Sequence, residues 1–554
     1  MKNVEIRTEK TGIELKATVR NTGTEPVKPG EVAVFRAEHR YSPDTPIYGE
    51  GYQMLSQYRG TVENPKNITY LSDRDHYKLP QRDGYHTVYN LLAVKTAEGK
   101  CDMYVFTSCR RFNGKIVWNA DSIELILDLE NVSVAPGEEL ETEYFAVMKD
   151  APVAAAFREA GKLISRRHPK KKLDERPAGW CSWYCFGPQV TEDDVDRNTE
   201  FISENIPELK FVQIDDGYQE YMGDWLFVSD KFGDLDSVLR KINDNGCESA
   251  IWVAPFIAQA ESRVFREHPE YFVKDEDGKP LSSGKFTFEG WRYGPWYMLD
   301  GTNPGARGYL THVFRTMREE KNIKYFKLDA NVWGCFKNGV RYRPDATSVE
   351  AYREGMKAIF EGAGDDAVIL GCNAPMWPSI GAVNAMRISG DLARDIKTIR
   401  MLSQEIVLRG WMNGVFWVND PDVFTVINQR GSELTENELR IHKSLMFVSG
   451  GMMLSGDDMT AYTRENLRDA MILLGTPDAA PEVDCFDTSV VRISDRFARY
   501  VGIFNTSDEE RVFRVAAPGA AAAESIWGQR SVRVEDGSFA VTLPPRDADV
   551  LSLL

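Results

Sequence analysis

The chain has 554 residues, of which 42% are hydrophobic and 27% are charged, and its formal net charge is −17. This length exceeds one compact core and predicts two to four domains, while the acidic balance argues against nucleic acid or an anionic membrane as a main partner. The amino terminus lacks the apolar core of a signal peptide, and no run approaches the roughly 18 apolar residues of a membrane span. We therefore expect a cytoplasmic protein with a neutral ligand.

Residues 1–150 consist of short strand-like runs separated by turns. Alternation of apolar and polar residues at this density predicts an N-terminal β-sandwich. The runs are Glu14–Val19, Glu31–Arg36, Val88–Val94, Met103–Thr107, Ile123–Leu127 and Glu143–Val147.

One stretch of this region, Gly49–Gly60, does not have a strand pattern, because it is rich in glycine and carries Tyr52 and Tyr58. It is either an ordinary surface loop or a lip over a neighbouring site. A helix from Ala154 to about Arg166 follows, and we interpret residues 151–176 as a helical linker.

Residues 177–478 alternate between strand and helix patterns. Eight candidate strands separated by amphipathic helices over about 300 residues predict a (β/α)8 barrel, and only the gap from Leu370 to Ala385 leaves no room for a helix. Residues 479–554 return to strand patterns and predict a small C-terminal antiparallel β domain. The candidate barrel strands are Gly179–Trp183, Lys210–Ile214, Ser249–Val253, Tyr325–Leu328, Ala367–Leu370, Ala385–Ile388, Val415–Val418 and Met452–Leu454.

The fourth candidate strand delivers a lysine and a carboxylate together. Lys327 and Asp329 are two residues apart, so their side chains point to the same face of a strand. In a parallel barrel that face is the interior, and catalytic residues collect at its carboxyl end. A structural ion pair is the alternative interpretation.

Nearly every other strand also ends in a polar or aromatic residue. Several neighbouring carboxylates would repel one another unless they share protons or bind a ligand rich in hydroxyl groups. This arrangement favours a sugar, whose apolar face stacks on aromatic rings. The strand-end residues are Asp215, Asp216, Trp252, Cys372, Asn373, Arg387, Asp391, Asp420, Asp422, Asp457 and Asp458.

The sequence contains no motif for a metal or a common cofactor. There is no HExxH, no phosphate-binding Walker loop and no GxGxxG after a strand, so we expect chemistry without a cofactor. The eight cysteines lack the density of a disulfide scaffold, and most are expected to be reduced.

Seven motifs along the barrel segment resemble, in order, those of the retaining α-galactosidases of glycoside hydrolase family 36. The resemblance covers roughly Pro177 to Asp458, and the flanking β regions suit the compact bacterial members. The motifs are Gly179-Trp-Cys-Ser-Trp-Tyr184, Gln213-Ile-Asp-Asp-Gly-Tyr218, Ile251-Trp-Val-Ala-Pro255, Phe326-Lys-Leu-Asp329, Leu370-Gly-Cys372, Met386-Arg-Ile-Ser-Gly-Asp391 and Trp417-Val-Asn-Asp-Pro-Asp422.

This resemblance implies that Asp329 is the nucleophile and Asp391 the acid/base of a glycosidase. The two carboxyl groups of a retaining enzyme stand about 5–5.5 Å apart. We expect pairing with Lys327 to keep Asp329 ionised, and poorer solvation to keep Asp391 protonated. The implied sugar-binding residues are Asp215, Asp216, Trp252, Lys327, Cys372, Asn373, Arg387, Trp180 and Tyr52.

Two departures from the family pattern leave the terminal sugar open. Compact members commonly supply a tryptophan from the N-terminal domain, whereas this chain offers Tyr52 and Tyr58, and Asn373 stands where glycine is common. Both differences fall where the sugar's 2-position or the leaving group would be bound. Galactose and N-acetylgalactosamine are both candidates.

Three functions are compatible with these features. The preferred one is hydrolysis of α-linked galactosides in oligosaccharides. The alternatives are galactosyl transfer of the raffinose or stachyose synthase kind, which requires exclusion of water from the intermediate, and sugar binding without turnover. A homo-oligomer is also compatible with the sequence.

Overall fold

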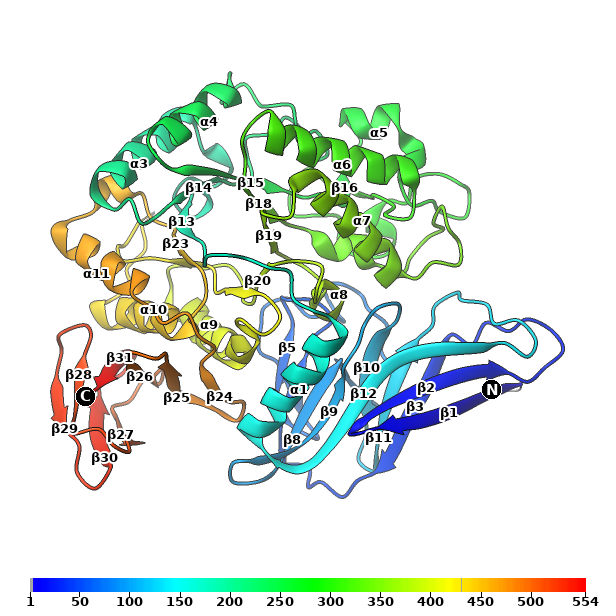
Figure 1. The fold of residues 1–554 in the computed structure, drawn as a ribbon, viewed down its shortest axis with the longest axis horizontal. Coiled ribbons are helices and arrows are strands. Elements are labelled where there is room, and N and C mark those ends of the chain that lie inside the picture. The colour runs from blue at the N-terminus through cyan, green and yellow to red at the C-terminus, as the bar shows by residue number, and fades with distance from the viewer. Residues whose placement is uncertain (1–2, 430) are drawn as a thin grey trace.

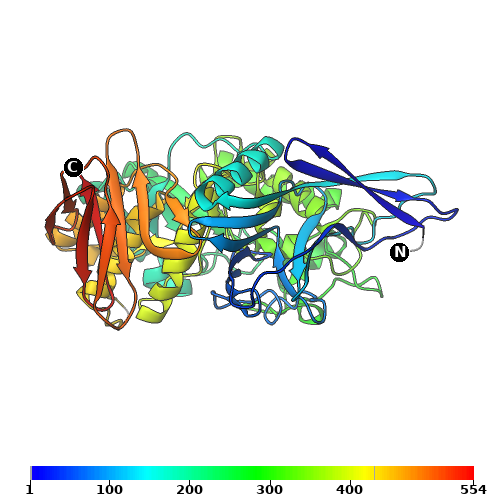
Figure 2. The same cartoon turned by 90° about the horizontal axis from the view of Figure 1, so that it is seen from below.

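The computed structural model describes residues 3–429 and 431–554. It has three parts: N-terminal antiparallel sheets, a central barrel of parallel strands covered by helices, and a C-terminal antiparallel sheet (Figure 1). The N-terminal and C-terminal β regions lie at opposite ends of the long axis (Figure 2). Within the described ranges, none of the helices has the length and apolar character needed to span a membrane.

The N-terminal region contains an eight-stranded and a four-stranded antiparallel sheet that share an apolar core. Their period-two burial confirms the predicted β-rich fold. In spatial order the larger sheet is β1 (Val4–Thr11), β2 (Glu14–Asn21), β12 (Glu139–Pro152), β9 (Lys100–Phe106), β8 (Leu91–Ala97), β4 (Pro46–Glu50), β5 (Gln57–Thr61) and β6 (Pro65–Asn67). The smaller is β3 (Glu31–Glu38), β11 (Ser122–Asp128), β10 (Asn113–Trp118) and β7 (His86–Tyr89).

The Gly49–Gly60 stretch forms a β-hairpin, and only its middle part is a loop. Its ends belong to β4 and β5, and Gly49 pairs with Tyr58 in antiparallel register. A Cβ atom on Gly49 would lie 2.6 Å from a methyl carbon of Val88, so close packing requires glycine here. Only residues 51–56 connect the two strands, and these continue toward the barrel.

The central sheet has parallel strands in the order β21-β20-β19-β18-β15-β14-β13-β23-β22. It confirms the barrel predicted from the alternating pattern, since the chain joins β21 to β22 and thereby closes the ring. The strands are β13 (Ala178–Cys181), β14 (Phe211–Ile214), β15 (Glu248–Val253), β18 (Tyr325–Leu328), β19 (Val368–Gly371), β20 (Ala385–Arg387), β21 (Val418–Asp420), β22 (Val423–Phe424) and β23 (Met453–Ser455).

The seventh strand differs from its prediction. Strand structure begins at Val418 rather than spanning Val415–Val418, because residues 414–416 form a turn that buries Phe416. The strand is then divided at Pro421, which has no N–H group to donate to a neighbouring strand. Its first half pairs with β20 and its second half with β23.

Helices separate most of the barrel strands, as the alternating pattern predicted, and their starts are specified locally. Thr191, Thr347 and Thr435 each form a capping box with the acidic residue three positions later. The gap from Leu370 to Ala385 does hold one helical turn, α8 (Met376–Ser379), contrary to expectation. The others are α1 (Val153–Arg167), α2 (Trp183–Phe186), α3 (Glu192–Asn205), α4 (Leu235–Asp244), α5 (Arg263–Glu267), α6 (Pro304–Glu319), α7 (Ser348–Ala363), α9 (Ile396–Arg409), α10 (Glu436–Ser449) and α11 (Arg464–Leu474).

The C-terminal region is antiparallel, as predicted, and the structure shows that it has an apolar core of its own. In β30 (Ser538–Leu543) the residues Phe539, Val541 and Leu543 are buried while their neighbours are exposed. The other strands are β24 (Glu482–Asp484), β25 (Asp487–Ser494), β26 (Arg499–Asn505), β27 (Arg511–Ala516), β28 (Ala522–Ser525), β29 (Ser531–Arg533) and β31 (Asp547–Leu553).

A two-stranded sheet of β16 (Ile257–Ala258) and β17 (Tyr297–Met298) stands beside the barrel.

A buried ion pair fastens the N-terminal hairpin to the barrel. Arg409, at the end of α9, lies 2.8 Å from the Glu50 carboxylate, and both side chains are fully buried. The same guanidinium donates to the carbonyl groups of Ser56 at 2.7 Å and Ile388 at 3.0 Å. This contact fixes residues 51–56 against the barrel end that follows β20.

Candidate active site

A cavity of about 540 Å³ opens at the carboxyl ends of the barrel strands. Residues from the N-terminal region, among them Met54, Tyr70 and His76, form part of its wall. The carboxyl end is where parallel barrels place their catalytic groups. The cavity brings together eight residues predicted from the sequence: Asp215, Asp216, Trp252, Lys327, Asp329, Cys372, Asn373 and Asp391.

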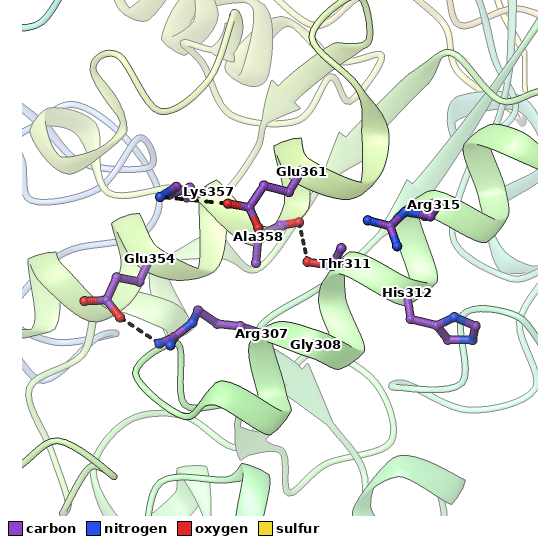
Figure 3. A pocket seen from close by; sticks show the side chains of 9 residues that line it. All are labelled: Arg307, Gly308, Thr311, His312, Arg315, Glu354, Lys357, Ala358 and Glu361. Atoms are coloured by element: carbon purple, nitrogen blue, oxygen red, sulfur yellow. Dashed lines mark hydrogen bonds and ion pairs between the residues drawn. The ribbon is translucent and has the colours of Figure 1, made fainter.

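Another hollow, of about 610 Å³, lies on the outside of the barrel between α6 and α7. Figure 3 shows that its charged side chains pair locally, with Arg307 bonded to Glu354 and Lys357 facing Glu361. Its lining contains none of the residues predicted from the strand ends. The chemistry is therefore concentrated in the cavity at the strand ends.

Asp329 follows β18 and is held by two donors. Its carboxylate accepts a hydrogen bond from the Trp252 indole at 3.1 Å and from the Ala330 amide at 2.7 Å. Ala330 has a φ of +52°, a left-handed conformation that is uncommon for alanine. Such strain is typical of residues that functional sites hold in place. Desolvation raises the pKa of Asp329, and the charge of Lys327 partly opposes the shift.

The ion pair of Lys327 is formed with Asp215 rather than with Asp329. The ammonium group lies 2.9 Å from the Asp215 carboxylate, which also accepts from the Gln213 amide at 2.6 Å. The expected direct pairing of Lys327 with Asp329 is thus replaced by a longer-range interaction. Because both members of the pair are buried, each offsets the desolvation of the other.

Asp216 presents one carboxylate oxygen that no described residue pairs with. Its Oδ1 atom accepts from Gln219 at 2.7 Å and from the Arg292 guanidinium, whereas Oδ2 is buried and unpaired. Burial raises the pKa of Asp216 to about 6. A buried acceptor at a cavity wall is suited to a ligand hydroxyl, because an unmade hydrogen bond there is costly.

Asp391 occupies an accessible position beside a buried arginine. Its side chain is 53% exposed and lies 2.8 Å from Arg387, which is 1% exposed. The Tyr184 hydroxyl donates to the same carboxylate at 3.3 Å. Desolvation favours the protonated form, but the charges of Arg387 and Lys327 outweigh it and lower the pKa of Asp391. This direction is opposite to the sequence-based expectation, because the pairing with Arg387 was not foreseen.

Two buried carboxylates bracket the backbone around Asp391. The Gly390 amide donates to Glu405 at 2.8 Å, and the Leu392 amide donates to Asp422 at 2.7 Å. Arg387 lies 2.8 Å from Asp422 as well as from Asp391. Burial raises the pKa of both Glu405 and Asp422 to about 7. The position of Asp391 is therefore fixed from both sides.

Asn373 is oriented by the N-terminal region. The Tyr77 hydroxyl donates to its side-chain oxygen at 2.7 Å, and its backbone has a φ of +43°. Asparagine tolerates this left-handed conformation better than most residues. Cys372 lines the cavity beside it.

Three predicted sugar-binding residues do not line the cavity. Arg387 lies beneath it and acts through Asp391 and Asp422. Trp180 is fully buried and donates its indole N–H to the Asp457 carbonyl at 2.7 Å. Tyr52 is 7% exposed and donates to the Cys335 carbonyl at 2.5 Å, so it packs behind the cavity wall. The placement of Trp180 and Tyr52 among the sugar contacts is accordingly corrected.

Tyr58 is likewise not a residue of the cavity mouth. It belongs to β5, and its hydroxyl group donates to the buried Asp73 carboxylate at 3.4 Å. The N-terminal contribution comes instead from Met54, Leu55, Tyr70, Leu71 and His76. Their sequence carries no strand-end signal, since they stand in connections of an antiparallel region.

An aromatic wall and a cation complete the cavity. Phe288 and Trp291 line it and make edge contacts with Trp333 behind them. Arg292, next in the chain, forms the ion pair with Asp216. Nothing in the sequence pattern predicted that Arg292 reaches Asp216.

The chain matches one protein-family model and several curated proteins over part of its length. Residues 209–362 match the family model described as Melibiase. The mouse myogenesis-regulating glycosidase is 29% identical over 153 residues, which are 27% of this chain and 20% of that protein. The α-galactosidase Mel36A of Lactobacillus acidophilus is 22% identical over 302 residues, 51% of this chain and 37% of that protein. The chain therefore spans less than two-fifths of the length of these curated relatives.

Solved structures share the fold over nearly the whole chain. The family 36 α-galactosidase AgaA of Geobacillus stearothermophilus aligns with a TM-score of 0.68 and 13% identity, covering 99% of this chain and 81% of that one. The α-galactosidase TtGalA of Thermus thermophilus aligns with a TM-score of 0.63 and 19% identity, covering 88% and 97%. The chain therefore matches the melibiase family model over residues 209–362, and it shares its overall fold with solved α-galactosidases of glycoside hydrolase family 36.

Proposed function

We propose that this protein is a retaining α-galactosidase that removes terminal α-linked galactose from oligosaccharides, with Asp329 as nucleophile and Asp391 as acid/base. The observation that carries the proposal is the presence of both carboxylates in one strand-end cavity with different surroundings. Asp329 is held by an indole and an amide, whereas Asp391 is accessible beside Arg387. A retaining glycosidase requires two such carboxyl groups.

In the first step, the Asp329 carboxylate attacks the anomeric carbon and the bond to the glycosidic oxygen breaks. The proton of the Asp391 carboxyl group passes to that oxygen, and the remaining sugar leaves. Trp252 and the Ala330 amide hold Asp329 in one orientation for this attack. The product is a covalent β-linked galactosyl-Asp329.

In the second step, the Asp391 carboxylate takes a proton from a water molecule, whose oxygen attacks the anomeric carbon. The bond to Asp329 breaks and galactose leaves with its α configuration retained. The lowered pKa of Asp391 favours its ionised form in the free protein, and the ionised carboxylate is the form that accepts this proton. A bound sugar excludes water from Asp391, and the added desolvation favours the protonated form that the first step requires.

The cavity supplies groups that suit a neutral sugar. The unpaired Oδ2 atom of Asp216 is an acceptor for a hydroxyl group, and Asp215 and Lys327 form a polar pair beside it. Trp252 and the aromatic wall offer apolar faces to the C–H surface of the ring. The solved relatives named above support galactose, because TtGalA was captured with p-nitrophenyl α-D-galactopyranoside and an AgaA variant with raffinose.

We also place the protein in the cytoplasm. Its eight cysteines are buried thiols, which is the state that a reducing compartment maintains.

A panel of p-nitrophenyl α-glycosides differing at C2 and C4 tests the proposed substrate. The galactoside should be turned over with the highest kcat/KM, and proton NMR should show the α-anomer as the first-formed sugar. Preference for the N-acetylgalactosaminide would change the assigned sugar. A β-anomer as the first product, or no turnover of any glycoside, would contradict the proposed function.

A further inference from the structure

Two carboxylates beside the active-site cavity share one cation. The Nη2 atom of Arg387 lies 2.8 Å from an oxygen of Asp391 and 2.8 Å from an oxygen of Asp422. The side chains of Arg387 and Asp422 are both buried, at 1% and 3% exposure. The proposed mechanism moves protons through Asp391 only, and it leaves the second carboxylate on the same nitrogen atom unused.

One positive charge does not neutralise two carboxylates. If Asp391 and Asp422 are both ionised, the three side chains carry a net negative charge at a site where the guanidinium and one carboxylate are buried. Two carboxylates at one site do not readily ionise together, so the pair binds a proton more tightly than a single carboxylate would. We therefore expect the pair to hold one proton under conditions in which a solvated aspartate holds none.

The neighbouring cations are paired with other carboxylates. Lys327 pairs with Asp215, and Arg409 pairs with Glu50. Among the described residues, Arg387 is thus the cation within ion-pair distance of both Asp391 and Asp422. The other ionisable groups that interact with these side chains are Tyr70 of the N-terminal region, Tyr184 of α2, Asp329 after β18, Cys372 after β19, Glu405 of α9 and Asp420 of β21.

Asp422 is the member of the pair that holds a proton more readily. Burial raises the pKa of Asp422 to about 7 against the charge of Arg387, and the nearby charge of Asp391 adds to the increase. The pKa of Asp391 is instead lowered. The Tyr184 hydroxyl forms hydrogen bonds with both carboxylates, so a proton has a short path from one to the other.

We propose that Asp422 is a positioning residue that shares one proton with Asp391, and that this shared proton is the one donated to the glycosidic oxygen. The inference rests on the proposed function, in which Asp391 is the general acid. In the free protein the proton is bound to an Asp422 oxygen. When a sugar displaces water from Asp391, that O–H bond breaks and an O–H bond to Asp391 forms, so the pair keeps its net charge. The ionised Asp422 then pairs with Arg387 while Asp391 is neutral.

The backbone at Asp422 permits a substitution that removes only the charge. Its φ of +80° is a left-handed conformation that asparagine tolerates better than most residues. The side-chain oxygen of asparagine can still accept the hydrogen bond that the Leu392 amide donates at 2.7 Å. Asp422→Gly also permits this conformation, but it removes the charge and the acceptor together.

The pH dependence of Asp422→Asn tests the inference. The measurement is kcat/KM for raffinose and for α-galactosyl fluoride, whose leaving group needs no proton. Without Asp422, Arg387 acts on Asp391 alone, and the acid loses its proton at lower pH. We expect the alkaline limb for raffinose to move to lower pH by about one unit or more, so that kcat/KM at pH 7 falls at least about tenfold. The value for the fluoride should change by less than about threefold.

A limb at unchanged or higher pH, or an equal loss for both substrates, would overturn the inference. Asp549→Asn is the matched control, because Asp549 is also buried and pairs with an arginine, Arg530, but in the C-terminal sheet. Neither value should change in this control. If Asp422→Asn does not fold, Asp422→Gly repeats the comparison, and loss of folding in both variants would show a structural role alone and overturn the inference.

Difference infrared spectroscopy tests the shared proton without turnover. Subtraction of the spectrum of the matching Asp422→Asn variant isolates the carboxylic acid band of Asp422, which should disappear as pH rises through about 7. In Asp391→Ala the band should disappear at lower pH, because the neighbouring negative charge is absent. An unchanged titration in Asp391→Ala would overturn the inference. The expected titrations in a protein that turns over no glycoside would support the shared proton and contradict the proposed function.

Discussion

Arg387 lies 2.8 Å from the Asp391 carboxylate, four residues further along the chain, and donates through the same nitrogen atom to the Gly390 carbonyl at 3.0 Å. The guanidinium is buried while the carboxylate is accessible. A buried positive charge therefore controls the ionisation of the group that we propose as the acid/base. This relationship has direct consequences for the pH dependence of the reaction.

The Tyr184→Phe substitution should move the alkaline limb of kcat/KM to higher pH. The Tyr184 hydroxyl donates to Asp391 at 3.3 Å and lowers its pKa, so its loss raises that pKa. A general acid is active while protonated, and Asp391 would then keep its proton to higher pH. The measurement is kcat/KM for an unactivated disaccharide across pH. Tyr500→Phe, at a remote strand, serves as the control, and a limb that moves to lower pH would refute the argument.

The two proposed catalytic carboxylates are distinguishable by azide rescue. Asp391→Ala should still form the intermediate from activated aryl galactosides but hydrolyse it slowly, because water lacks its base. Azide needs no deprotonation and should give the α-azide. Asp329→Ala should lose turnover on every substrate, and azide should replace the nucleophile and give the β-azide. Product NMR decides between them, and reversed stereochemistry would require the two roles to be exchanged.

Truncation of Asp216 should reduce recognition of the sugar. If its unpaired Oδ2 atom accepts a sugar hydroxyl, Asp216→Ala loses roughly 1–3 kcal/mol of transition-state stabilisation, measured from kcat/KM. A galactoside that lacks the contacted hydroxyl should show no such loss. Equal kinetics for the variant and the unmodified protein would remove Asp216 from the sugar site.

Glu405→Gln should stabilise the protein at neutral pH but not at pH 4. Glutamine keeps an oxygen for the Gly390 amide and removes a buried charge. Burial raises the pKa of Glu405 from 4.5 to about 7, so ionisation destabilises the folded state as pH rises through that interval. The difference corresponds to on the order of 3 kcal/mol at pH 8. Thermal unfolding of both proteins at pH 4 and pH 8 measures it, and a pH-independent difference would contradict the assignment.

Glu50→Ala should destabilise the protein strongly. The substitution leaves the fully buried Arg409 without its carboxylate partner, and removal of one partner of a buried pair costs about 3–5 kcal/mol. Asp193→Ala breaks the surface pair with Arg197 and should cost less than about 1 kcal/mol. Urea unfolding compares the two variants, and similar losses would show that the buried pair does not carry the docking of the hairpin.

The sequence alone determined the barrel and the residues that the strand ends contribute to the cavity wall. Strand and helix periods are local properties, and capping boxes such as that of Thr347 with Glu350 specify where helices start. Parallel strands must end at one face of a barrel, so Asp216, Asp329 and Asp391 could be grouped without any structure. Two features differ from what the local sequence pattern predicted, because contacts with neighbouring strands determine them. One is the division of the seventh strand at Pro421, and the other is the hairpin that contains Gly49.

The tertiary structure decided which charges pair and which side chains reach the cavity. Lys327 pairs with Asp215 from a strand two positions away in the barrel, Arg292 reaches Asp216 from a distant loop, and Glu405 supports Gly390 from the following helix. The Tyr52 side chain does not line the cavity, and its hydroxyl group donates to the Cys335 carbonyl instead. Such choices depend on contacts between residues far apart in the chain, which periodicity does not encode. Burial then sets the pKa of each group, because desolvation and nearby charges exist only once the chain is folded.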